Sequence, residues 1–132
     1  MQRSYNLIRE LSKYHDVTLL AFNQQAIIPK EKIPGAVEHF KVFCKCVEIF
    51  DIASENSTFL KIFALIRGLF LGNTYNTIWL ESSEYERRLT EKLQQEKFDL
   101  IHVDTISLVP FVKNLNHLKR SLNHHNIESL MM

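Results

Sequence analysis

The stretch FDLIHVD, residues 98–104, decides the fold predicted for this chain. Leu100, Ile101 and Val103 make a short apolar run, which is typical of a buried strand in a parallel sheet. Helical and strand-like segments alternate on its N-terminal and C-terminal sides. Strands that alternate with helices indicate an α/β domain with a mainly parallel sheet.

The segments before this strand contribute helices and two further strands. Tyr5, Ile8, Leu11 and Tyr14 recur at helical spacing and predict a helix over residues 3–14. DVTLLAF (16–22) is apolar on both faces and predicts a buried strand, whereas Pro29 and Pro34 predict a loop. The alternation in FKVFCKCVEIF predicts a strand over 40–50. Two helices are expected next, around 58–71 and over 77–96.

The segments after residue 104 continue the alternation. SLVPFVKNL has a helical pattern in which Pro110 is acceptable only in the first turn. KRSLNH (119–124) predicts a short strand, and a helix is expected to start with Asn126 as its N-cap. We therefore expect one domain over residues 1–132, a Rossmann-like three-layer α/β domain. Such a fold normally opens with a strand, so we expect the usual first strand to be lacking and both ends to be truncated.

Composition narrows the class of protein. Sixteen basic and fifteen acidic residues give a net charge of +1, which offers no electrostatic argument for nucleic-acid binding. Cys44 and Cys46 do not form a disulfide framework, and the N-terminus has no apolar signal-peptide core, so a cytoplasmic protein with reduced thiols is expected. The segment TFLKIFALIRGLFLG (58–72) is shorter than the about 20 residues of a membrane span. We expect it to be buried or to contact a protein, with peripheral membrane contact as the alternative.

Three segments carry a resemblance to a known family. RSYNLIRELSKYHDVTLLAF, FDLIHVD and HHNIES occur in this order, and together they resemble the N-terminal, acceptor-side half of family 4 glycosyltransferases, which are retaining enzymes of the two-domain GT-B architecture. The resemblance extends over essentially the whole chain, and its last segment is the most specific. It implies transfer of a sugar from a nucleotide-sugar to an acceptor in glycan synthesis, with no further cofactor.

The family pattern also contains parts that this sequence does not match. A first strand and a glycine-rich loop would precede Arg3, and a C-terminal domain would carry the nucleotide-sugar site. Because one domain cannot hold both donor and acceptor, we expect the chain to be a fragment or degenerate copy that is inactive alone. The missing strand would lie between the VTLL strand and the DLIHV strand. Its absence would leave strand edges that invite dimerisation, or association with the missing C-terminal domain.

The resemblance also implies a set of site residues. His125 matches the family histidine that approaches the donor sugar near the reaction centre, and it is the candidate catalytic residue. Asp104 is placed to meet acceptor hydroxyls, and Arg3 would face a phosphate beside the glycine-rich loop. The residues that would cap the next helix and shape the loop are Asn126, Glu128 and Ser129.

Other interpretations remain open at this point. His124 is better explained as a packed or surface residue than as a ligand, and a first-turn charge explains Glu128 at least as well as a site role. A metal-dependent hydrolase would need an ion at His102, Asp104 and a terminal histidine, but no closely spaced ligand pair is present, so no metal is predicted. The alternative to a glycosyltransferase fragment is a non-catalytic interaction module that self-associates. Three basic residues are expected to form a solvated face: Lys113, Lys119 and Arg120.

Overall fold

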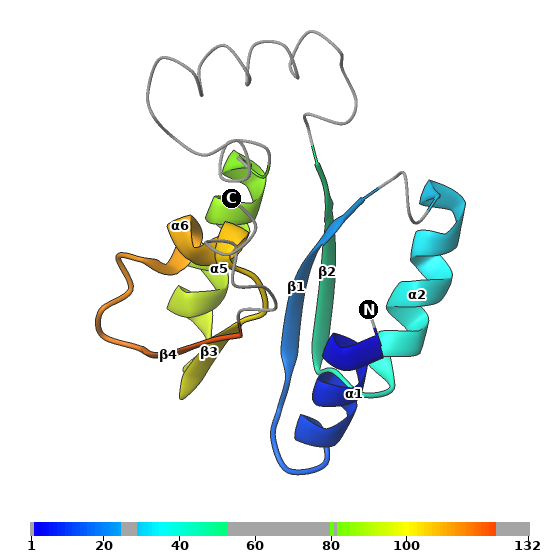
Figure 1. Ribbon diagram of the computed structural model, residues 1–132, viewed down its shortest axis with the longest axis horizontal. Coiled ribbons are helices and arrows are strands. Elements are labelled where there is room, and N and C mark those ends of the chain that lie inside the picture. The colour runs from blue at the N-terminus through cyan, green and yellow to red at the C-terminus, as the bar shows by residue number, and fades with distance from the viewer. Residues whose placement is uncertain (1, 25–28, 53–79, 81, 124–132) are drawn as a thin grey trace, which may run out of the picture. The chain divides into compact units, whose positions relative to one another are not determined.

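The structure is a computed structural model that describes residues 2–24, 29–52, 80 and 82–123. The chain divides into two compact units, Met1–Thr58 and Phe59–Met132. Within the described residues, the first unit contains in order α1 (Gln2–Leu11), β1 (Thr18–Asn23), the 3-10 helix η1 (Lys30–Lys32), α2 (Ile33–Lys41) and β2 (Cys46–Asp51). The second contains α5 (Ser83–Gln95), β3 (Leu100–Val103), the 3-10 helix η3 (Ile106–Leu108), α6 (Val109–Val112) and β4 (Lys119–Leu122) (Figure 1).

Each unit is built on one pair of parallel strands. The registers run from Thr18 opposite Cys46 to Asn23 opposite Asp51, and from Leu100 opposite Lys119 to Val103 opposite Leu122. In the part of the chain that the structure describes, no hydrogen-bonded ladder joins one pair to the other. The predicted combination of helices with parallel strands is therefore confirmed. The three-layer Rossmann-like arrangement and the single domain over residues 1–132 stay predictions.

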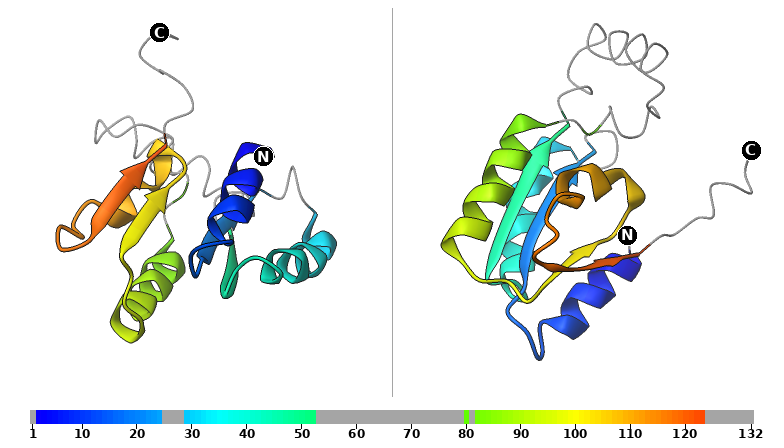
Figure 2. Two further views of the ribbon diagram at one scale, coloured as in Figure 1. Left: turned by 90° about the horizontal axis from the view of Figure 1, so that it is seen from below. Right: turned by 90° about the vertical axis from the view of Figure 1, so that its left-hand side faces the viewer.

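An aromatic cluster joins the two helices of the first unit. The Tyr5 ring of α1 stacks on His39 of α2 at 5.6 Å between centroids, and its hydroxyl lies 3.0 Å from His39 Nε2. Phe40 and Phe43 meet the same Tyr5 ring edge-on, each at 5.9 Å. Figures 1 and 2 show α1 and α2 on the same face of the β1–β2 pair. Tyr5, predicted as part of an apolar helical stripe, thus fixes α1 against α2.

The segment 33–45 differs from the prediction. The expected loop at Pro34 is the first turn of α2, where proline removes no intrahelical hydrogen bond. The strand predicted over 40–50 begins only at Cys46, because Phe40 still belongs to the helix and the chain then turns. The alternation read as a strand is equally compatible with helical spacing from Phe40 to Phe43, and the contacts with Tyr5 decide in favour of the helix.

In the second unit, α5 begins at a well-formed cap. The Ser82 hydroxyl accepts a hydrogen bond from the Tyr85 backbone N–H at 3.2 Å, which satisfies one of the otherwise unpaired donors of the first turn. Tyr85 is 7% exposed, and its ring lies 4.8 Å from that of Phe111 in α6. Leu89 and Leu93 follow on the same side and are half-buried, as the four-residue spacing predicts.

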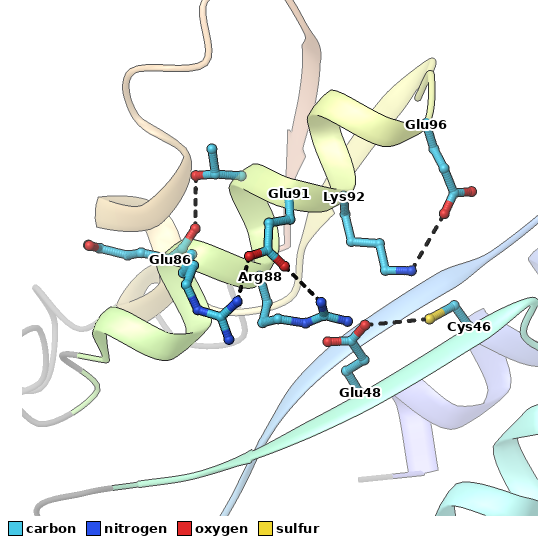
Figure 3. A network of polar contacts seen from close by, with 9 residues as sticks. Cys46, Glu48, Glu86, Arg88, Glu91, Lys92 and Glu96 are labelled. Atoms are coloured by element: carbon cyan, nitrogen blue, oxygen red, sulfur yellow. Dashed lines mark hydrogen bonds and ion pairs between the residues drawn. The ribbon is translucent and has the colours of Figure 1, made fainter.

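Ion pairs between half-buried side chains run along α5. Figure 3 shows Glu91 accepting from Arg88 at 2.8 Å and Lys92 lying 3.5 Å from Glu96. Both pairs join residues three or four positions apart, which are neighbours on a helix surface. Such pairs contribute little to stability each, at most about 1 kcal/mol. The charged residues of α5 thus pair with one another along the helix.

Arg120 is exposed, as expected for a solvated residue, and it also makes several hydrogen bonds. Its guanidinium donates to the backbone carbonyls of Val112 at 2.9 Å and Lys113 at 2.8 Å, and to Asn116 Oδ1 at 3.2 Å. The end of a helix leaves carbonyls without intrahelical donors, and a cation is favoured there. Arg120 therefore ties the C-terminal end of α6 to β4, and all three basic residues, Lys113, Lys119 and Arg120, are exposed as predicted.

Within the described residues, no helix is both long and apolar enough to cross a bilayer. The apolar segment 58–72, for which peripheral membrane contact was the alternative, lies entirely outside the described residues. The same holds for the helix expected from Asn126. Of the helix predicted over 77–96, the described residues show α5 over Ser83–Gln95 only, since Leu80 lies in a turn and Ser82 is the N-cap. Pro110 lies in the first turn of α6, as expected.

Tyr85 is expected to make the protein less stable at alkaline pH. Burial raises the pKa of Tyr85 to about 12, from an ordinary value of 10.0 in the unfolded chain. The protonated Tyr85 side chain therefore makes its full contribution to the free energy of unfolding below pH 10. That contribution, about 3 kcal/mol, is lost as the pH rises from 10 to about 12. Thermal melts across this range test the expectation. If the Tyr85→Phe variant declines as steeply as wild type, the effect does not come from Tyr85.

Candidate functional site

The carboxyl ends of β3 and β4 bring two polar side chains together. Asp104 follows β3 and Asn123 follows β4, and the Asn123 amide donates from Nδ2 to Asp104 Oδ1 at 3.0 Å. The Asn123 backbone N–H also donates to the Val103 carbonyl at 2.8 Å, which continues the pairing by one residue beyond β4. Two adjacent parallel strands therefore end in a carboxylate whose position is fixed by an amide.

His102 and Ser121 extend this cluster along the strands. They are opposite each other in the register, and His102 Nδ1 lies 3.3 Å from Ser121 Oγ. Since residues two apart on a strand project to the same face, His102 lies on the face of Asp104. Its Nε2 is 3.9 Å from Asp104 Oδ1, and the two side chains are 29% and 32% exposed. We call Asp104, Asn123, His102 and Ser121 the strand-end cluster.

The strand-end cluster suits recognition better than nucleophilic catalysis. A Ser–His–Asp triad needs hydrogen bonds from the histidine to both partners. Here the contact between His102 and Asp104 is 3.9 Å, which is longer than a hydrogen bond. A carboxylate accepts hydrogen bonds, and a neutral imidazole donates one and accepts one. The cluster thus offers both donors and acceptors to a ligand hydroxyl at the end of the strands.

The other predicted site residues are distributed as follows. Arg3 lies in the first turn of α1 and is exposed, and it belongs to the first unit, whereas Asp104 belongs to the second. The remaining predicted residues lie outside the described residues: His125, Asn126, Glu128 and Ser129. Asp104 has Asn123 and His102 beside it, and the catalytic role of His125 stays a prediction.

The metal alternative required Asp104 and His102 together with a terminal histidine. His102 and Asp104 are neighbours, but His124 and His125 are outside the described residues. Over 2–24, 29–52, 80 and 82–123, no three histidine, cysteine or acidic side chains gather closely enough to hold an ion. The pair formed by His102 and Asp104 supplies two ligands, one fewer than a catalytic zinc site takes from the protein.

The cysteines are free thiols, as the sequence predicts. Cys44 is buried and Cys46 is half-buried, and the Cys46 thiol donates to Glu48 Oε1 at 3.8 Å (Figure 3). Burial raises the pKa of the Cys44 thiol, and its neighbour Cys46 adds to the shift. A raised pKa disfavours the thiolate, which is the reactive form. Cys44 is therefore a packed residue rather than a nucleophile.

Two residues of the strand-end cluster were missed from the sequence. Asn123 directly follows β4 (119–122), just as Asp104 directly follows β3 (100–103). Equivalent positions of adjacent parallel strands meet at one edge of a sheet. That signal was sufficient to find Asn123. Ser121 required the register, because only the pairing of His102 with Ser121 shows that the two side chains are opposite.

Comparisons of the chain with protein-family models, with curated proteins and with solved structures found no match.

Proposed function

We propose that the chain is the acceptor-binding domain of a GT-B-type retaining glycosyltransferase, with the strand-end cluster as the place where acceptor hydroxyls bind. The observation that carries the proposal is the Asp104 carboxylate, held by Asn123 at 3.0 Å and flanked by His102 at the carboxyl ends of parallel strands. Ligands of open α/β sheets bind at these ends. A carboxylate accepts a hydrogen bond from a sugar hydroxyl, and a neighbouring imidazole N–H can donate one to the hydroxyl oxygen.

The strand pairing is a second support. In the family that the sequence resembles, a further strand lies between the VTLL strand and the DLIHV strand. Here these strands are β1 and β3; β1 pairs with β2, and β3 pairs with β4. The segment HHNIES (124–129) follows β4 after one intervening residue, Asn123. This order is the one expected if β1 and β3 occupy the family positions.

In the proposed role, another domain binds the nucleotide-sugar donor. The nucleotide-sugar would be bound by a C-terminal-type domain, and the transfer would retain the configuration of the sugar. The chain alone is then an acceptor-binding part without transferase activity. Glycan synthesis in the cytoplasm is the setting that we propose.

The test is acceptor binding by the chain itself. We would titrate the labelled protein with the methyl glycosides of glucose, galactose, mannose and N-acetylglucosamine and follow the side-chain amide of Asn123 by NMR. We expect that amide and the backbone amide of Asp104 to shift with at least one of them, at millimolar affinity. Asp104→Ala should abolish the shift, because the carboxylate that accepts the hydroxyl is gone.

Asp99→Ala is the matched control, since Asp99 is exposed at the amino end of the same strand. It should leave binding unchanged. If no glycoside shifts Asn123, or if Asp99→Ala is as harmful as Asp104→Ala, the strand-end cluster is not an acceptor site.

Self-association without catalysis is the second candidate. It is favoured by the two-stranded ladders, since each strand of the described chain pairs on one edge only. Unpaired edges are templates for pairing with another chain. Light scattering over a range of protein concentrations, combined with the glycoside titration, distinguishes the two functions. A stable dimer that binds no glycoside supports the non-catalytic, self-associating module. A monomer that binds a glycoside supports the acceptor-binding domain.

A further inference from the structure

We draw no further inference here: the strongest candidate, the buried side-chain amide of Asn23 at the end of β1, carries nothing, because nothing in the described part of the chain shows what would accept its hydrogen bond.

Discussion

Replacing Tyr85 by alanine lowers the free energy of unfolding by about 3–5 kcal/mol, the range measured for large buried aromatic residues. Tyr85 is 7% exposed and meets Phe111 at 4.8 Å, so its removal leaves a cavity between α5 and α6. Domains of this size have only about 5–15 kcal/mol in total. The loss is therefore a large part of what holds the second unit together.

Chemical denaturation with urea measures this loss, and Tyr85→Phe is the matched control. Phenylalanine keeps the ring and its contact with Phe111, so we expect a loss of about 1 kcal/mol or less. The comparison separates the ring from the hydroxyl. If Tyr85→Phe is as destabilising as Tyr85→Ala, the contribution of Tyr85 comes from its hydroxyl and not from packing against α6.

Ile52→Ala is the second large effect, with an expected loss of about 2–5 kcal/mol. Ile52 directly follows β2 and is 1% exposed, the least exposed large side chain of the described residues. Its truncation removes buried methyl groups that water does not replace. Urea denaturation monitored by circular dichroism gives the difference from wild type.

The control for this variant is Ile106→Ala, the same change at a side chain that is 40% exposed. A half-exposed isoleucine loses less on truncation, and we expect about 1 kcal/mol or less. Equal losses at Ile52 and Ile106 would show that burial at the end of β2 does not determine the stability of this chain.

Prediction from the sequence worked where local pattern and tertiary contacts agree. α5 was found because Tyr85, Leu89 and Leu93 lie on one helical face, and β3 because its apolar run is short and bounded. α2 was missed because Pro34 and Gly35 are ordinary loop residues except in a first turn, where they are acceptable. Its helical state depends on packing with Tyr5, which is 34 residues from His39 in the chain.

Some residues of the candidate site likewise follow from the local sequence pattern, whereas others follow only from the tertiary structure. Asp104 was predicted because polar residues at the carboxyl ends of parallel strands follow from the pattern. The bond from Asn123 to Asp104 and the pairing of His102 with Ser121 depend on the register, which the sequence alone leaves open. Outside the site, the burial of Asn23 could not be predicted, since nothing in TLLAFN distinguishes a buried asparagine from an exposed one.

The strand pairing described above also bears on how the chain folds during synthesis. Each parallel pair joins strands that follow one another in sequence, and bonded residues of β3 and β4 are only 19 positions apart. Short separations keep the entropy of loop closure low and favour fast folding. Both β1 and β2 are synthesised before any residue of the second unit. Each pair can therefore form from its own contacts, in the order in which the ribosome delivers it.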